Sequence, residues 1–301
     1  MKEFTKFIVA ISIFIIALVL CNKLAVRVCD SLYSNNTHKI NYAAYNTETA
    51  DIVIFGSSRA SHHYIPSIIS DTMSMSCVNL GEDGQGILYN YALFNMLMRN
   101  NTPRIVVYEF GGFDWEDGGY SGFHRLEALS PIYGNFDSVD SLINRSFGEY
   151  KTVVSILDMY RYNNKLHKII KGDDNLQGRL GYSPLYGSNV KSVNDVDDID
   201  EPLISSDKVE YLRRLTKECS DRGVLLIFVT SPSLSTSNAE MSTKILKGID
   251  ENVRYIRYDN HEFDYCYFKD NTHLNHSGAE VYSSIFASDL KDLYNSVISV
   301  Q

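Results

Sequence analysis

Three polar residues have the side-chain types that can together activate a hydroxyl group. Ser58 ends a Gly-Ser-Ser turn directly after the apolar residues 52–55, and Asp270 and His273 stand near the C-terminus. A serine hydroxyl is a weak nucleophile unless a base takes its proton. An imidazole can be that base, and a carboxylate on its other ring nitrogen fixes the tautomer and stabilises the imidazolium. These residue types predict nucleophilic catalysis if the fold brings them together.

The elements around these residues place them at one edge of a sheet. Residues 52–55 are apolar and largely β-branched, as in a parallel strand buried on both faces, and Gly56 permits a tight turn. A hydroxyl after such a strand lies at the carboxyl edge, where open α/β folds bind ligands. The loop of residues 259–275 follows the last expected strand and carries Asp270 and His273 to the same edge. The alternative is that Gly-Ser-Ser forms only a turn.

The rest of the chain alternates apolar strands with amphipathic helices. Further strands are expected at residues 77–81, 104–110, 224–229 and 253–258, and helices at 66–72, 87–99, 206–222, 241–249 and 277–297. This alternation predicts an α/β fold, a three-layer α/β/α sandwich with a five-stranded parallel sheet of the flavodoxin-like type.

Residues 115–204 interrupt this alternation as an insertion into the body, residues 51–301. They include one expected helix at 149–171, with Val153, Ile156, Leu157 and Tyr160 on its inner face. An insertion after a strand tip hangs over the carboxyl edge, so a lid or substrate-binding role is one hypothesis. A purely structural excursion is the other.

The N-terminus contains the apolar run of residues 7–21, flanked by Lys2, Lys6 and Lys23. Its length falls between a signal-peptide core and a full membrane span. We expect an uncleaved anchor over residues 1–28 and a polar linker over residues 29–50. The basic N-terminus predicts a single-pass protein of the cell membrane with its body extracytoplasmic. A cleaved signal, a lipoprotein and a buried helix are the alternatives.

Composition excludes several function classes. The net charge of −9 argues against nucleic acid as a partner, and 22% charged residues against a long disordered chain. The five cysteines have no Cys-x-x-Cys spacing, so neither a zinc site nor a disulfide framework is expected. His62 and His63 follow the serine turn without partners at metal-ligand spacing, and no metal site is predicted.

These residues resemble the conserved blocks of the SGNH (GDSL-like) hydrolase family, in order along the body. Gly56-Ser57-Ser58 matches the first block, which makes Ser58 the nucleophile by resemblance. Gly84 is the closest match to the oxyanion-hole glycine, whose amide would act with that of Ser58, and Gly81 is the alternative. Asp270 and His273 match the last block. The resemblance implies a catalytic triad that needs no metal or organic cofactor.

The third block departs from the family pattern. Gly111-Gly112-Phe113-Asp114 aligns with Gly-x-Asn-Asp, and Phe113 replaces an Asn that donates a hydrogen bond to the oxyanion. Losing one such donor typically costs ~10²–10³ in rate. Asp114 caps or braces this loop or contacts substrate, and Arg59 and His63 are further candidates for substrate contact. His62 and His63 are otherwise expected in surface or capping roles.

An anchor ahead of such a domain also resembles proteins of extracellular polysaccharide O-acetylation and cell-wall D-alanylation. The resemblance implies a serine esterase or O-acyltransferase acting on acyl esters, with glycans of the cell envelope as the expected substrate. The alternative is a non-catalytic subunit that binds a glycan or a membrane O-acyltransferase, and Phe113 keeps that alternative open.

Overall fold

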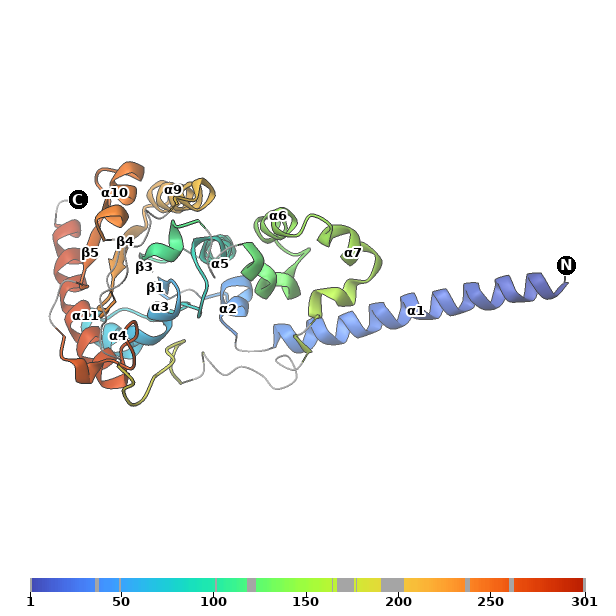
Figure 1. Cartoon of the computed structure of the whole chain (residues 1–301), viewed down its shortest axis with the longest axis horizontal. Helices are drawn as coiled ribbons and strands as arrows, with labels where there is room; N and C mark the ends of the chain where they lie inside the picture. Colours follow the sequence, from blue (N-terminus) through green and yellow to red (C-terminus); the bar gives the residue numbers. More distant parts are fainter. Residues whose placement is uncertain are drawn as a thin grey trace.

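In the computed structural model, a five-stranded parallel sheet forms the centre of the body (Figure 1). Its strands lie in the order β2-β1-β3-β4-β5. The strands are β1 Ile52–Phe55, β2 Cys77–Asn79, β3 Ile105–Glu109, β4 Leu225–Thr230 and β5 Tyr255–Arg257. The structure describes residues 2–35, 38–48, 50–100, 102–117, 123–163, 165–166, 176, 178–190, 203–235, 239–259 and 263–299. The predicted α/β class and parallel sheet are confirmed.

Helices cover both faces of the sheet because its central strands are apolar on both sides. Val53 and Val106 pack with α5 (Ile87–Asn100), α9 (Ser206–Asp221) and α10 (Ala239–Ile249). Ile54 and Val107 pack on the other face with α4 (Pro66–Met73) and α11 (His276–Ile298). The result is the three-layer sandwich that the alternation predicted.

The strand order reverses beside β1. The chain passes from β1 to β2 on one side and then crosses back to β3 on the other. In open α/β sheets, ligands bind at the carboxyl ends of the strands at such a reversal. The helix α3 (Ser58–His63) begins there, so the Gly-Ser-Ser turn opens a short helix.

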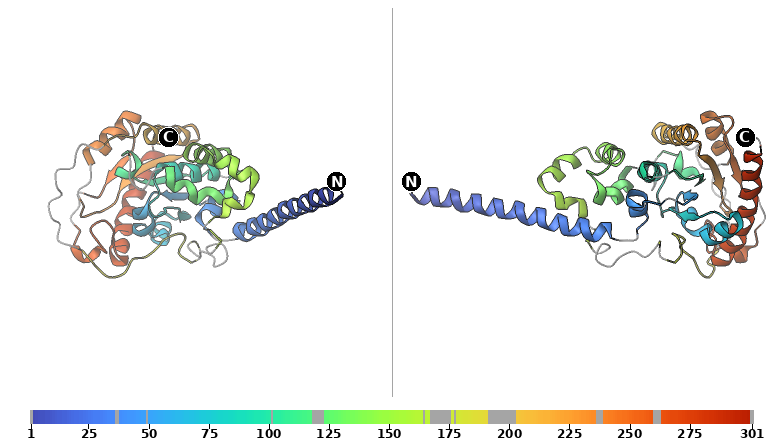
Figure 2. Two further views of the ribbon diagram at one scale, coloured as in Figure 1. Left: turned by 45° about the vertical axis from the view of Figure 1, so that its right-hand side comes forward. Right: turned by 180° about the vertical axis from the view of Figure 1, so that it is seen from behind.

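The N-terminal helix α1 (Lys2–Ser34) runs unbroken from an exposed apolar stretch into the body. It is long and apolar enough to cross a membrane, and no other helix in the described part of the chain meets that criterion. Its last turns are buried at Val26, Cys29 and Tyr33. Figures 1 and 2 show it projecting from the body as a single straight helix.

The structure corrects the expectation that residues 29–50 form a polar linker. Its first residues belong to α1, and α2 (Lys39–Tyr45) follows, with Ile40, Ala43 and Ala44 buried against the body. The polar composition concealed this packing, because the polar side chains of Lys39 and Asn41 are buried together with the apolar ones.

The inserted segment folds mainly beside α5 and α1. Its described elements are η2 (Phe123–Ile132), α6 (Asp137–Ser146), α7 (Tyr150–Ile156) and η3 (Asp158–Tyr162). The helix predicted at 149–171 is wrong, because α7 ends at Ile156 and Leu157 leaves the helical conformation at φ −135° and ψ 86°. Residues 167–171 of that prediction lie outside the described residues.

The break after α7 lets η3 dock on α1. Arg161 Nη2 lies 3.0 Å from Asp30 Oδ1, and its Nη1 donates to the carbonyls of Pro131 and Tyr133 at 3.0 and 3.2 Å. The Tyr162 hydroxyl also donates to Asp30. A continuous helix would carry Arg161 and Tyr162 away from Asp30, which is the physical reason for the break.

We predict that Arg161→Ala loosens this junction. The guanidinium is largely buried while Asp30 is about half exposed, so its loss should lower the free energy of unfolding by ~1–3 kcal/mol. Arg213→Ala, which removes an exposed pair with Glu210, is the control and should change stability far less. Thermal unfolding of the full chain in detergent measures both. Equal shifts for the two variants would contradict a structural role for the junction.

Candidate active site

Ser58, His273 and Asp270 lie together at the carboxyl edge of the sheet. Ser58 Oγ is 2.7 Å from His273 Nε2. His273 Nδ1 is 3.0 Å from Asp270 Oδ1 and 3.1 Å from Oδ2. The structure thus brings Ser58 to Asp270 and His273, which lie more than 200 residues later in the sequence, at the distances of a triad.

The protonation state of Asp270 sets the direction of these hydrogen bonds. Partial burial acts to raise the pKa of Asp270, but hydrogen bonds from the Thr272 amide and from the ring and amide of His273 outweigh it and bring the pKa below its usual value. An ionised Asp270 accepts a hydrogen bond from the Nδ1–H of His273. Nε2 is then the unprotonated nitrogen and accepts from the Ser58 hydroxyl.

A short, closed turn presents His273. Phe268 and Leu274 form an antiparallel bridge, and the Lys269 amide donates to the His273 carbonyl at 2.8 Å. Asn275 then caps α11 by accepting from the Gly278 amide at 3.0 Å. The turn and the cap fix the backbone on both sides of the imidazole.

His63 lies beneath the site, fully buried, which corrects its assignment as a surface or substrate-contacting residue. Its Nε2 accepts from the Leu274 amide at 2.9 Å, so Nδ1 carries the proton and donates to Ser231 Oγ at 2.8 Å. Ser231 Oγ in turn donates to Glu109 Oε1 at 2.9 Å. His63 therefore holds the residue after His273 in place.

Arg59 does not point to a free surface either. Its Nε lies 3.1 Å from Glu109 Oε1, and its Nη2 donates to the Phe110 carbonyl at 3.1 Å. A Cβ on Gly111 would clash with this guanidinium, so the glycine makes room for it. The predicted substrate contact of Arg59 is replaced by a buried ion pair.

Asp114 is also buried and accepts hydrogen bonds from the Tyr108 hydroxyl at 2.7 Å and the Gly111 amide at 3.1 Å. Burial raises the pKa of Asp114 to about 6, although these hydrogen bonds act to lower it. Of its two expected roles, bracing the loop after β3 fits this geometry. Phe113, one residue earlier, is about half exposed.

His62 is a second histidine of the site. It was expected at the surface, but only 8% of it is exposed. Its Nε2 lies 3.2 Å from Asp83, its Nδ1 2.5 Å from the Ser183 carbonyl, and its ring 5.7 Å from that of His273. Burial acts to lower the pKa of His62, but hydrogen bonds to Asp83 and Ser183 raise it above the usual value. The spacing of four residues from Ser58 on one helix was the available signal.

The loop that carries Gly84 packs between distant parts of the chain. Gly84 has φ +69°, and a Cβ there would overlap the Arg125 guanidinium of η2. Earlier in the loop, the buried Lys39 of α2 donates to the Gly81 carbonyl and lies 3.8 Å from Glu82. Nothing in the sequence signalled that Lys39 or Arg125 would approach this loop.

Residues 178–190 of the insertion pass beside the site. The Ser183 amide donates to the Ser61 carbonyl at 2.9 Å, and the His276 amide donates to the Leu185 carbonyl at 2.6 Å. This segment therefore joins α3 to the start of α11. The described helices of the insertion pack mainly on α5 and α1 instead.

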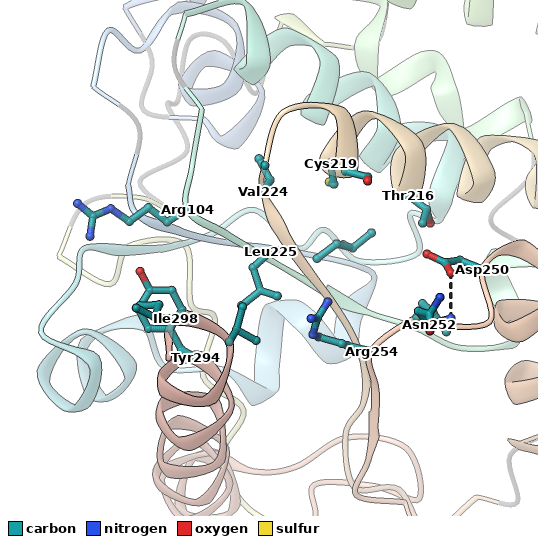
Figure 3. Close-up of a pocket in the computed structure, with 15 residues that line it drawn as sticks. Arg104, Thr216, Cys219, Val224, Leu225, Asp250, Asn252, Arg254, Tyr294 and Ile298 are labelled. Atoms are coloured by element: carbon teal, nitrogen blue, oxygen red, sulfur yellow. Dashed lines mark hydrogen bonds between the residues drawn. The ribbon is translucent and has the colours of Figure 1, made fainter. Parts of the chain in front are cut away.

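A pocket of about 410 Å³ opens at the opposite edge of the sheet, around the amino ends of β4 and β5 (Figure 3). Arg104, Asp250 and Arg254 are among its lining residues. It lies away from Ser58, since that residue follows the carboxyl end of β1. Among the described residues, no cluster of His, Cys, Asp and Glu could hold a metal ion.

Comparison with known proteins gives a limited result. No family model matches the chain, and no curated protein matches its sequence. Its structural neighbours include acylhydrolases and carbohydrate esterases.

Three of these neighbours show the extent of the likeness. A protein described as an acylhydrolase from Bacteroides fragilis is 11% identical, with 80% of this chain and 86% of that chain covered and a TM-score of 0.40. One described as a platelet activating factor from Streptococcus pneumonia has 9% identity, coverages of 92% and 98%, and a TM-score of 0.43. An active-site mutant of a family two carbohydrate esterase from Clostridium thermocellum is 8% identical, with 80% of this chain and 63% of that chain covered and a TM-score of 0.36. The chemistry must therefore be argued from the site itself.

The buried ring of His63 makes a prediction about pH and stability. Burial, with the charges of Arg59, His273 and His62, lowers the pKa of His63 well below its usual value. Below about pH 6.5 the unfolded chain takes up a proton that the folded chain refuses, so stability falls as the pH falls, by at most ~1.4 kcal/mol per pH unit. His63→Gln should reduce this slope in denaturant unfolding between about pH 6.5 and 5.

Ser231→Ala is the matched control, because it breaks the same hydrogen-bond chain but keeps the imidazole. It should lower stability at every pH and retain the wild-type slope. A slope unchanged in His63→Gln would show that His63 is not buried in the neutral form.

Proposed function

We propose that this chain is a membrane-anchored serine esterase or O-acyltransferase of the SGNH type, with Ser58, His273 and Asp270 as its catalytic triad. The 2.7 Å contact between Ser58 Oγ and His273 Nε2 carries the proposal, because it joins a nucleophile to a base already oriented by a carboxylate.

The geometry supports a two-step acyl transfer. Ser58 Oγ attacks the ester carbonyl carbon while His273 Nε2 takes the hydroxyl proton. The tetrahedral intermediate collapses, the C–O bond to the alcohol breaks, and Nε2 gives the proton to the departing oxygen. Water or an acceptor hydroxyl then attacks the acyl carbon while His273 Nε2 takes its proton. The bond from this carbon to Ser58 Oγ breaks, and Nε2 returns the proton to Oγ. Asp270 stays ionised through both steps and stabilises the imidazolium.

The oxyanion of the tetrahedral intermediate needs hydrogen-bond donors. Ser58 is the first residue of α3, so its amide has no acceptor within the helix. We assign this amide and that of Gly84 to the oxyanion, since Phe113 offers no side-chain donor. The missing donor also favours one rival function, a non-catalytic subunit that binds a glycan or a membrane O-acyltransferase.

The anchor supports the proposed location and substrate. An apolar helix that continues without a break into the body keeps the body beside a membrane, and the basic residues Lys2 and Lys6 favour an extracytoplasmic body. Acyl esters of cell-surface glycans are substrates within reach of such a body. No metal or organic cofactor takes part in the proposed steps.

We predict non-additive losses when the triad is dismantled. Ser58→Ala and His273→Ala should each lower kcat for an aryl acetate by roughly 10⁴-fold or more, and the double variant should be scarcely worse, because either change removes the same step. Asp270→Ala should cost less, since its carboxylate orients the imidazole without taking the proton. Steady-state kinetics on purified full-length protein measure all four.

Ser57→Ala is the matched control, because Ser57 adjoins the nucleophile and its side chain makes no capping hydrogen bond. A fluorophosphonate should label wild type and Ser57→Ala at Ser58, and labelling should fall sharply in His273→Ala. If folded wild type neither labels nor turns over esters, while glycan or partner binding survives Ser58→Ala, the binding subunit replaces the enzyme.

The proposed topology has a separate test. A protease added to intact spheroplasts should digest the body while a cytosolic marker protein stays whole, because α1 would hold the body outside. A tag placed before Lys2 should remain attached to the undigested chain if α1 is not cleaved. Complete protection of the body, with digestion only after lysis, would contradict this orientation.

A further inference from the structure

Three exposed apolar residues lie where α7 passes into η3. Ile156, Leu157 and Tyr160 are 79%, 47% and 39% exposed, and we call them the α7 tip. The sequence pattern predicted these residues on the buried face of a helix. The structure buries Tyr150 and Val154 of α7 instead. Exposing neighbouring large apolar side chains is unfavourable in water, so such a group indicates a contact surface.

The contacts between η3 and α1 set the position of the α7 tip along the N-terminal helix. The Met159 amide donates to Asn22 Oδ1 at 3.2 Å, and Lys23 Nζ lies 2.5 Å from Asp158 Oδ2. Asn22 and Lys23 directly follow the apolar residues 7–21. The α7 tip is therefore level with the end of the apolar run.

The next contact shows which way η3 runs. Arg161 pairs with Asp30, which is farther along α1 toward the body than Lys23, by roughly 10 Å at 1.5 Å per residue. Ile156 and Leu157 precede Asp158, at the end of η3 nearest the apolar run. All views in Figures 1 and 2 place α7 beside α1, at the side of the body from which α1 projects.

We propose that the α7 tip enters the interfacial layer of the bilayer that α1 spans. This inference rests on the anchor in the proposed function, and it adds a second membrane contact to it. Ile156 and Leu157 would lie among the outer acyl chains, and Tyr160 suits the headgroup level, where its ring is buried and its hydroxyl stays wet. The carboxylate of Asp158 is paired with Lys23 and so does not oppose the approach.

Lipid is favoured over protein as the occupant because the α7 tip lies level with the end of the apolar part of α1. A single helix leaves the body free to turn about the helix axis. A second contact removes that freedom and gives the sheet edge carrying Ser58 one orientation relative to the membrane plane.

Tryptophan fluorescence can test the contact. The chain has one Trp, Trp115, which is fully buried and donates to Ser242 Oγ at 3.0 Å. The full-length Ile156→Trp variant is placed in phosphatidylcholine vesicles with or without brominated acyl chains. The emission that the variant adds to that of the wild type should be blue-shifted, and the brominated lipid should largely quench it. The control is Ile285→Trp on α11, whose emission should be red and insensitive to bromination.

Two outcomes would overturn the inference. Red, unquenched emission from Ile156→Trp would place the α7 tip in water, and blue but unquenched emission would place it against protein, such as a second copy. Phe14→Trp, in the exposed apolar part of α1, separates the two proposals. Quenching of Phe14→Trp alone keeps the anchor and removes the tip contact. Absence of quenching in Phe14→Trp would contradict both the anchor and the membrane contact of the α7 tip. Ester turnover tests the proposed catalytic function separately.

Discussion

The buried carboxylate of Glu109 is the constraint on which the site depends. A charge withdrawn from water is costly unless ion pairing and hydrogen bonds replace its hydration. Burial raises the pKa of Glu109, and the guanidinium of Arg59 acts against that rise. The hydroxyls of Tyr64 and Ser231 and the Ser231 amide complete its shell. One side chain on β3 thus gathers groups from α3 and from the end of β4.

This shell also connects Ser58 to His273. Arg59 adjoins Ser58 in the chain, so its ion pair with Glu109 fixes the start of α3. Ser231 passes the connection to His63, and His63 fixes Leu274, the neighbour of His273. Ser58 and His273 are therefore positioned from the same buried carboxylate.

Much of this arrangement could be predicted from sequence because it follows from local patterns. Apolar strands that alternate with amphipathic helices predict a parallel sheet. Ser58 and His273 each follow a strand, and the carboxyl ends of parallel strands share an edge. Their predicted proximity needed only these two facts.

The sequence-based predictions that were wrong all depend on contacts between residues distant in sequence. Periodicity places Leu157 inside a helix, but the contact of Arg161 with Asp30 decides where that helix ends. Composition marks residues 29–50 as a linker, whereas Lys39 is buried against the loop of Gly81. His63 looked exposed because its partners, Ser231 and Leu274, lie far along the chain. Such contacts become visible only when the whole fold is assembled.

The unbroken passage of α1 into the body has a consequence for reach. A flexible tether of about 20 residues would let an anchored domain wander over roughly 25 Å. With α1 in a bilayer as proposed, the helical segment from Asn22 to Ser34 is instead packed against the body along roughly 18 Å of its length and holds the body rigidly at the membrane. The domain could not search for its target, and its local concentration would be high at one stand-off distance and negligible elsewhere. Substrate would have to be delivered to that height, by the growth of a polymer or by a neighbouring protein in the same membrane.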